Sequence, residues 1–364
     1  MKTNIILEIC LSPDLGGLEL TVVDMFHYFK LKTPTFIAVS QSGKLKKFIE
    51  DEQKKIILPK SKLFSLLKAK KLASYIDTHQ IDILHFHWNK DMLVVVLAKL
   101  LSLRKPKIVQ SRHMMMTRLK NDIYHRWLYK NIDTIHAVTE EVQYQLQKFI
   151  PQDICPKLEM VYLGTKKPEI NKTVLLSLRE KYNADNNFFI GIVGRIEEGK
   201  GQYLAIEALS LLKYLKNIKL LIIGSAMKKS YLEDLKKQVL KLNLEDQVVF
   251  IDFSKNIDSY MHIFDIFILA TKKETFGLVL LEAMMSKTAV LATNKGGPTE
   301  IINDGVDGLL FERNKEDLAK KIELLYLDSE YRNSIANKGY EKVQKMFQRE
   351  KQLEKLYKVV VNEN

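Results

Sequence analysis

The sequence predicts an α/β protein built from two doubly wound, Rossmann-like domains, and two observations indicate this fold. Short, continuous apolar runs alternate with longer helical patterns along nearly all of the 364 residues. Such runs are typical of strands that are buried on both faces of a parallel sheet. The same strand–helix rhythm occurs twice, and a chain of this length is long enough for two domains of about 150 residues each.

The first half of the chain, residues 1–165, is expected to form the N-terminal domain. Its predicted helices include Leu18–Lys30 and Leu63–Ile76. Its predicted strands are residues 4–9, 35–40, 82–87, 107–111 and 133–138. Because Glu8 interrupts the first apolar run, we interpret the start of the chain as a buried strand and not as a signal peptide.

The second half, residues 166–345, is expected to form a C-terminal domain of the same kind, with the boundary within 163–187. Its predicted strands are residues 188–194, 219–225, 247–252, 265–270 and 288–293. A charged helical stretch follows over about 314–360, and we expect a last helix, about 346–364, to pack back on the first domain. Parallel sheets bind ligands at the carboxyl ends of their strands, so two such domains facing each other would form a central cleft.

The composition excludes several classes of protein. Cys10 and Cys155 are the only cysteines, which is too few for a disulfide scaffold or a cysteine-rich zinc site. The longest apolar stretch, residues 92–103, contains Lys99 and is shorter than the roughly 20 residues that cross a bilayer. We therefore expect a cytoplasmic protein.

The net charge of +13 is unevenly distributed, with +10 on residues 1–170 and +3 on the remainder. This asymmetry indicates an anionic partner for the first half, either nucleic acid, anionic lipid or a phosphorylated substrate. A general use of lysine as a surface residue explains the total charge about as well.

In each half of the chain, the turn after the first predicted strand carries residues that could bind an anion. Gly16 and Gly17 would let backbone N–H groups approach an anion at a helix N-terminus, although a tight turn with positive φ explains them too. Arg195 and Lys200 occupy the equivalent turn of the second half. A guanidinium and an ammonium group suit phosphate oxygens there, and the helix dipole favours an anion. The second turn therefore predicts a diphosphate site.

Two carboxylates follow the predicted strand 265–270. Glu274 is expected on the loop after this strand, and Glu282 about one turn into the next helix. Carboxylates at such a position are natural acceptors for sugar hydroxyls. The sequence contains no Asp-x-Asp triad, so we predict that no metal holds the diphosphate and that positive side chains and helix dipoles stabilise it.

Three histidines lie near the ends of predicted strands. His113 follows strand 107–111, where it would touch a substrate or be satisfied in the packing. His85 and His87 share one face of strand 82–87, and no acid close in the sequence completes a metal set. We interpret both as structural or cleft-lining residues and not as metal ligands.

Taken together, these residues resemble the retaining glycosyltransferases of family four, which have the GT-B fold. The resemblance is strongest over 188–312, where Gly-Arg, Lys-Gly, Glu-x7-Glu, Gly-Gly-x-x-Glu and Asp-Gly-x-x-Gly-Leu follow in order. The first half matches more loosely, through Gly16-Gly17, His113 and the run 137–142. The loops at 225–227, at Lys287 and at 162–165 depart from the family pattern.

The resemblance implies an enzyme of bacterial cell-surface glycan synthesis that moves a hexose-type sugar from a UDP- or GDP-linked donor without a cofactor. Arg195 and Lys200 would hold the diphosphate, Glu274 the sugar hydroxyls and Glu282 the ribose. The remaining donor-site residues would be Gly16, Gly17, Phe276, Gly277 and Leu278, and His113 would reach the transferred sugar.

The resemblance also implies that the basic first domain binds the acceptor, a lipid-linked or lipopolysaccharide-type glycan. A basic, partly apolar surface suits an anionic membrane, and a solvated charged face is the simpler interpretation. The basic residues expected there are Lys60, Lys62, Lys68, Lys70, Lys71, Arg104, Lys105, Lys107, Arg112, Arg118, Lys120 and Arg126, with Met114, Met115 and Met116 among them. The alternatives are a sugar-nucleotide epimerase of the same fold and a basic nucleic-acid-binding protein. No nucleic-acid-binding motif supports the latter, so we expect no nucleic-acid partner.

Overall fold

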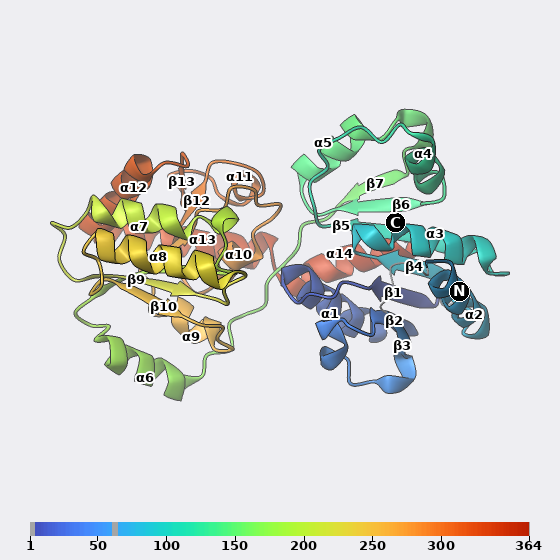
Figure 1. Cartoon of the computed structure of the whole chain (residues 1–364), viewed down its shortest axis with the longest axis horizontal. Helices are drawn as coiled ribbons and strands as arrows, with labels where there is room; N and C mark the ends of the chain where they lie inside the picture. The colour runs from blue at the N-terminus through green and yellow to red at the C-terminus, as the bar shows by residue number, and fades with distance from the viewer. Residues whose placement is uncertain (1–3, 60–64, 364) are drawn as a thin grey trace. The chain divides into compact units, whose positions relative to one another are not determined.

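The computed structural model describes residues 4–59 and 65–363, which fall into two compact units. The first unit comprises the chain up to Leu163 together with Glu350 onward, and the second comprises Gly164–Arg349 (Figure 1). No helix among the described residues combines the length and apolar character needed to cross a membrane.

The first unit contains a seven-stranded, all-parallel sheet in the order β3-β2-β1-β4-β5-β6-β7. Phe29 packs against Tyr357, so helix α1 (Gly17–Lys30) and helix α14 (Arg349–Val361) lie together. The strands are β1 (Ile6–Cys10), β2 (Thr35–Ser40), β3 (Lys55–Leu58), β4 (Ile83–Phe86), β5 (Lys107–Arg112), β6 (Thr134–Ala137) and β7 (Lys157–Met160). The helices are α1 (Gly17–Lys30), α2 (Ser65–Thr78), α3 (Met92–Leu101), α4 (Ile123–Tyr129), α5 (Glu140–Phe149) and α14 (Arg349–Val361).

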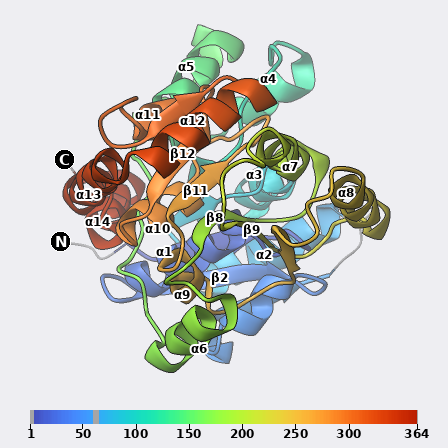
Figure 2. The ribbon, with the colours of Figure 1, turned by 90° about the vertical axis from the view of Figure 1, so that its left-hand side faces the viewer.

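The second unit contains a six-stranded, all-parallel sheet in the order β10-β9-β8-β11-β12-β13, with helices on both faces (Figure 2). The strands are β8 (Phe188–Val193), β9 (Ile218–Ile223), β10 (Val248–Ile251), β11 (Ile266–Leu269), β12 (Ala289–Thr293) and β13 (Leu309–Phe311). The helices are α6 (Lys172–Tyr182), α7 (Gln202–Ser210), α8 (Lys229–Lys241), α9 (Ile257–Met261), α10 (Leu278–Met285), α11 (Pro298–Ile301), α12 (Lys315–Leu327) and α13 (Ser329–Met346).

These sheets confirm the predicted fold class of two Rossmann-like domains. Each of the ten predicted strands is present, and β3, β7 and β13 were not predicted. The predicted helix Leu63–Ile76 corresponds to α2, and its first two residues lie outside the described part of the chain. The boundary region 163–187 is not a simple linker, because it contains α6; Asn183 ends this helix with a left-handed φ of 50°.

Candidate active site

The turn between β8 and α7 is fixed at the carboxyl end of the second sheet. Gly194 and Gly201 have φ values of 148° and 74°, which other residues rarely adopt. A Cβ at Gly201 would lie 2.3 Å from the Ala270 carbonyl oxygen, so the turn sits directly on the end of the β11 strand. The buried Gln202 Nε2 donates to the Arg195 carbonyl at 2.9 Å, while the Arg195 side chain is exposed. The structure therefore holds the backbone of this turn and leaves the guanidinium group free to reach solvent.

Lys200 and Glu274 are brought together from different loops, as expected of two residues of one site. Lys200 lies in the single-turn 3-10 helix η6 (Glu198–Lys200), and its Nζ is 3.1 Å from Glu274 Oε2. The two loops also share a backbone hydrogen bond, in which Lys272 N donates to the Gly199 carbonyl at 2.8 Å. The side chains of Lys200 and Glu274 are 26% and 19% exposed, so water reaches the ion pair.

The loop carrying Glu274 is held in shape by Gly297, a residue whose role the sequence analysis did not predict. Gly297 N donates to the Glu274 carbonyl at 3.0 Å. A Cβ at Gly297 would lie 2.5 Å from Phe276 Cα, so only glycine permits this close approach. The Phe276 ring is buried and packs edge-on against Phe347. In the sequence, the run Gly-Gly-Pro at 296–298 was the feature that could have indicated this role of Gly297.

Helix α10 starts next to this loop and carries three predicted residues. Gly277 is its N-cap, with φ 103° and without a capping side chain, and Leu278 is its first residue. The N-terminal N–H groups of a helix favour an anion or a polar ligand group. Glu282 lies one turn into α10 and is partly buried, at the position expected from the sequence.

The structure contradicts one of the two interpretations of Gly16 and Gly17, that of a tight turn with positive φ. Gly16 is the N-cap of α1 with an extended backbone, φ −161°, and Gly17 begins the helix. Neither has a positive φ, so a strained turn does not explain them. A Cβ at Gly17 would meet no atom within 4 Å. A Cβ at Gly16 would lie 3.5 Å from Glu19 Oε2, so the buried Glu19 carboxylate lies beside the start of this helix.

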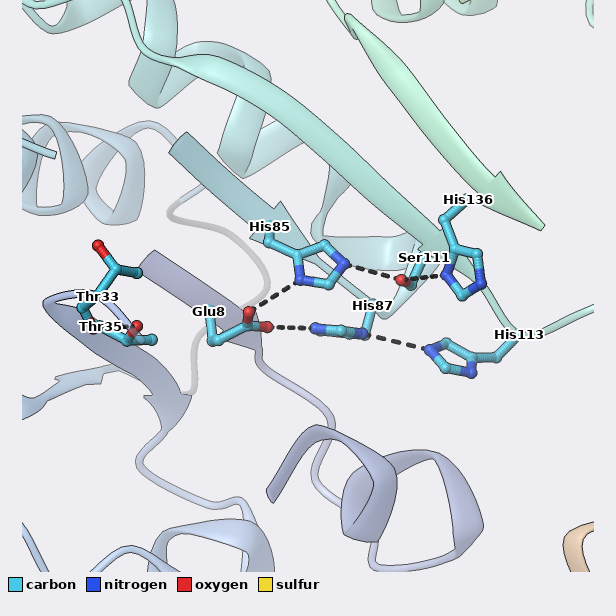
Figure 3. A network of polar contacts seen from close by, with 8 residues as sticks. All are labelled: Glu8, Thr33, Thr35, His85, His87, Ser111, His113 and His136. Atoms are coloured by element: carbon cyan, nitrogen blue, oxygen red, sulfur yellow. Dashed lines mark hydrogen bonds and ion pairs between the residues drawn. The ribbon is translucent and has the colours of Figure 1, made fainter. Parts of the chain in front are cut away.

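His113 is the end of a buried polar network in the first unit (Figure 3). Strand pairing places Glu8 opposite His85 and Ser111 opposite His136, so these side chains share one face of the sheet. Glu8 Oε1 is 2.9 Å from His85 Nδ1, and Glu8 Oε2 is 2.6 Å from His87 Nε2. His87 Nδ1 is 3.3 Å from His113 Nε2.

Burial and charge shift the pKa values of this network strongly. Burial alone would raise the pKa of the Glu8 carboxyl, but the charge and hydrogen bonds of His85 and His87 hold it at about 2. Burial lowers the pKa of His87 to about 4 and that of His136 to about 3. Burial also lowers the pKa of His113 well below its usual value. At neutral pH these three rings are therefore neutral and Glu8 is a carboxylate.

The expectation that no nearby acid completes a metal set with His85 and His87 was wrong, because Glu8 reaches both from the neighbouring strand. The carboxylate and the two rings offer ligand atoms within 4.8 Å of one another. Each of these atoms already takes part in a hydrogen bond of ordinary length inside a fully buried site. These hydrogen bonds account for the geometry of the cluster.

Part of the basic surface predicted for the first unit is not at the surface. The Arg112 side chain is buried and donates to the carbonyls of Met114 and Met115, and Met116 is buried as well. Arg126 is paired with Asp153. Lys60 and Lys62 lie outside the described residues. Arg118 and Lys120 lie on the loop between β5 and α4, beside exposed apolar residues.

The two parallel sheets and a charged turn at the carboxyl end of the second are typical of the GT-B fold. The family model for "Glycosyltransferase Family 4" matches residues 15–165, and that for "Glycosyl transferases group 1" matches residues 177–342. The chain belongs to this family of glycosyltransferases. Lys200 and Glu274 lie in the half matched by the group 1 model, and Gly16, Gly17 and His113 lie in the other half.

Curated relatives agree with the family. An uncharacterized glycosyltransferase of Methanocaldococcus jannaschii, MJ1178, is 28% identical over 344 residues, which is 90% of each chain. The capsular polysaccharide biosynthesis glycosyltransferase CapM of Staphylococcus aureus is 30% identical over 194 residues. The N-acetylgalactosamine-N,N'-diacetylbacillosaminyl-diphospho-undecaprenol 4-alpha-N-acetylgalactosaminyltransferase of Campylobacter jejuni is 30% identical over 187 residues. The last two alignments span about half the length of those relatives.

Solved structures agree in fold. A glycosyltransferase from Rickettsia africae superposes with a TM-score of 0.87 and 24% identity, covering 100% of both chains. HepE of Anabaena, in complex with UDP and glucose, superposes with a TM-score of 0.85 and 21% identity, covering 99% of this chain and 100% of that one.

Proposed function

We propose that the chain transfers a hexose-type sugar, with retention and without a metal, from a nucleotide diphosphate sugar to a lipid-linked or lipopolysaccharide-type glycan. The observation that carries this proposal is the pairing of Lys200 Nζ with Glu274 Oε2 at 3.1 Å, beside the uncapped start of α10. A diphosphate would replace the carboxylate as the partner of Lys200, and sugar hydroxyls would replace the ammonium as partners of Glu274.

Breaking the bond from the anomeric carbon to the diphosphate places additional negative charge on the phosphate and an oxocarbenium character on the sugar. Arg195, Lys200 and the helix N-termini would stabilise the leaving group, and losing one such group costs on the order of 10²–10³ in rate. We infer same-face attack, in which the leaving phosphate accepts the proton of the acceptor hydroxyl. Glu274 would orient the sugar and form no covalent adduct.

The other predicted residues complete the donor site. Glu282 would accept hydrogen bonds from the ribose, and the backbone at Gly16-Gly17, where α1 begins, would approach the phosphates. His113 would touch the transferred sugar. The remaining donor contacts would come from the backbone of Phe276, Gly277 and Leu278.

The printed names of similar proteins support the choice of substrates. HepE was crystallised with UDP, and also with UDP-glucose, which favours a UDP-linked donor over a GDP-linked one. The Campylobacter relative is named for a diphospho-undecaprenol acceptor, and LpsE of Rhizobium meliloti, 28% identical over 159 residues, for lipopolysaccharide core biosynthesis. These names favour a lipid-linked or lipopolysaccharide-type acceptor.

The test is release of nucleoside diphosphate from a panel of UDP-, GDP- and ADP-sugars, with Mg²⁺ or with EDTA. We expect slow release from one donor, unaffected by EDTA. Glu274→Gln should abolish release yet keep binding of the nucleoside diphosphate, whereas Glu198→Gln, an exposed neighbour on the other loop, should act like wild type. Isomerisation of the donor without release would indicate the epimerase instead, and full activity of Glu274→Gln would refute our assignment of this residue.

We further propose that the first unit docks on an anionic membrane surface through α4 and the loop before it. Ile123 is 88% exposed at the start of α4, and Leu119, Tyr124 and Trp127 are also exposed. Arg118 and Lys120 lie on the same loop. Apolar side chains beside basic ones suit the interface of a bilayer with anionic headgroups. This location would bring the enzyme to a lipid-linked acceptor at the inner face of the cell membrane.

Co-sedimentation with phosphatidylglycerol vesicles and with phosphatidylcholine vesicles tests this surface. We expect binding to the anionic vesicles only, and loss of most binding in Ile123→Asp. Leu327→Asp alters a leucine that is 68% exposed on α12 of the second unit and serves as the matched control with retained binding. Equal sedimentation of wild type and Ile123→Asp would contradict the proposal.

A further inference from the structure

In the histidine network of the first unit, the atom that carries each proton can be derived step by step, starting from His136 (Figure 3). His136 Nε2 lies 2.7 Å from the Val161 carbonyl oxygen. A carbonyl oxygen only accepts, so Nε2 carries the proton and donates. Because the buried ring is neutral, with a pKa of about 3, its Nδ1 holds a lone pair. Ser111 Oγ, 2.7 Å away, must therefore donate its proton to that nitrogen.

The same reasoning fixes the next link. Having donated its only proton, Ser111 Oγ accepts from His85 Nε2 at 2.8 Å. The remaining proton lies between His85 Nδ1 and Glu8 Oε1, which are 2.9 Å apart. This proton lies within that hydrogen bond, and because the pKa of Glu8 is about 2, Glu8 Oε2 carries no proton.

The other oxygen of Glu8 determines the order toward His113. Glu8 Oε2 accepts from His87 Nε2 at 2.6 Å. A neutral His87 then has a lone pair on Nδ1, which faces His113 Nε2 at 3.3 Å. Two facing lone pairs would repel, so the single proton of the neutral His113 lies on Nε2. His113 Nδ1 is left without a proton, on a side chain that is half-buried at the start of the loop after β5.

We propose that Glu8 acts through His87 as a positioning residue, holding His113 in the Nε2-protonated tautomer so that Nδ1 accepts a hydrogen bond from a hydroxyl of the bound sugar. The part of this inference that concerns the sugar rests on the proposed function. If Glu8 were neutral, with its proton on Oε2, every proton along His87 and His113 would move to the opposite nitrogen. His113 Nδ1 would then donate instead of accepting. The carboxylate thus determines whether His113 Nδ1 accepts a hydrogen bond from the hydroxyl or donates one to it.

Histidine ring nitrogens in the full-length protein report this directly. Two-bond ¹H–¹⁵N correlation spectra of the histidine-labelled chain distinguish a bare ring nitrogen from a protonated one, and a His113→Asn variant assigns the His113 signals. We expect a bare Nδ1 and a protonated Nε2 at neutral pH. The opposite tautomer in the wild-type protein would overturn the proposal without any further variant.

Two matched substitutions distinguish an effect of the hydrogen bonds from Glu8 through His87 to His113, here called the relay, from an effect of packing. His87→Phe removes the acceptor for His113, and we expect a mixture of both His113 tautomers. His136→Phe replaces a ring outside the path from Glu8 to His113, and should leave the His113 tautomer unchanged. An unaltered His113 in a folded His87→Phe protein, as judged by near-UV circular dichroism, would also overturn the proposal.

A donor analogue tests the contact with the sugar. Once the release assay has identified the donor, analogues with one hydroxyl replaced by hydrogen are compared in wild type and His87→Phe. We expect one analogue to lose roughly tenfold in kcat/KM with wild type, as for one lost hydrogen bond, and far less with His87→Phe. Equal losses in both proteins would overturn the sugar contact. A bare Nδ1 in a protein that binds no nucleotide sugar would instead refute the proposed function and support the relay.

Discussion

Replacing Asp91 by asparagine should stabilise the first unit, by an amount that increases with pH. Asp91 ends the 3-10 helix η4 (Asn89–Asp91) just before α3, and it is only 3% exposed. Its Oδ2 accepts a hydrogen bond from Leu11 N at 2.9 Å. Burial raises the pKa of this carboxyl to about 8, although the bond from Leu11 and the charge of Lys68 both lower it.

The magnitude follows from the difference between the folded and the unfolded chain. The Asp91 carboxyl ionises near pH 3.8 when unfolded and near pH 8 when folded. Between these values the folded protein holds a proton that the unfolded chain has released, so its stability falls as pH rises, by about 1.4 kcal/mol per pH unit. The total is on the order of 5 kcal/mol. Asparagine keeps an acceptor for Leu11 N and has no proton to release.

Urea unfolding followed by tryptophan fluorescence measures this effect, because Trp88 and Trp127 are the two tryptophans of the chain and both lie in the first unit. The gain of Asp91→Asn over wild type should grow from about pH 4 to pH 8 and then level off. Asp153→Asn is the control: its exposed carboxyl has a pKa below the usual value, because Arg126 donates to it. Its difference from wild type should stay constant over the same range. A constant difference for Asp91→Asn as well would show that Asp91 is ionised in the fold and would refute the reasoning.

Two further predictions concern the second unit and the histidine network. Gly297→Ala should displace the loop of Glu274 and lower both Tm and nucleotide binding, because its Cβ would lie 2.5 Å from Phe276 Cα; Gly199→Ala, whose Cβ meets nothing within 4 Å, should be tolerated in thermal denaturation. The first unit should lose stability as pH falls below about 6.5, because the folded pKa values of His87 and His136 are about 4 and 3 and the unfolded chain binds the protons first. The two rings together contribute a slope on the order of 2–3 kcal/mol per pH unit near pH 5. Because Asp91 contributes a slope of opposite sign over this range, urea unfolding is measured in the Asp91→Asn background. A flat profile there would contradict neutral buried rings.

The sequence was sufficient to predict the fold because its central strands are continuous apolar runs. β3, β7 and β13 escaped prediction, and each lies at an edge of its sheet, whereas the remaining edge strand, β10, has the unbroken apolar run Val248–Ile251 and was predicted. An edge strand has one neighbour and a partly solvated side, so its apolar pattern is short or interrupted by charge, as in Lys157–Met160. Local pattern therefore identifies the centre of a parallel sheet better than its edges.

In the candidate site too, local pattern predicted some features and could not predict others. Glu274 and Glu282 were placed correctly on their loop and helix because strand and helix periods fix those positions. The contact of Glu8 with His85 depends on strand register, since the two residues are 77 positions apart. No local pattern contains that information. The available signal was the glutamate itself, because a charged residue within a buried strand requires a partner.

The Lys200–Glu274 pair and the Glu8–His85 pair have different physical consequences, and this difference bears on which can take part in binding. The Lys200–Glu274 pair is partly exposed, and such pairs are worth about 0–1 kcal/mol. Exchanging partners for a diphosphate and a sugar therefore costs little. The Glu8–His85 hydrogen bond is fully buried, and removing one partner would leave a buried polar group unsatisfied, which is strongly destabilising. The first pair is suited to rearrange around a ligand, whereas the second is suited to keep its protons in one order. A network of the second kind can direct His113 without being disturbed by what His113 binds.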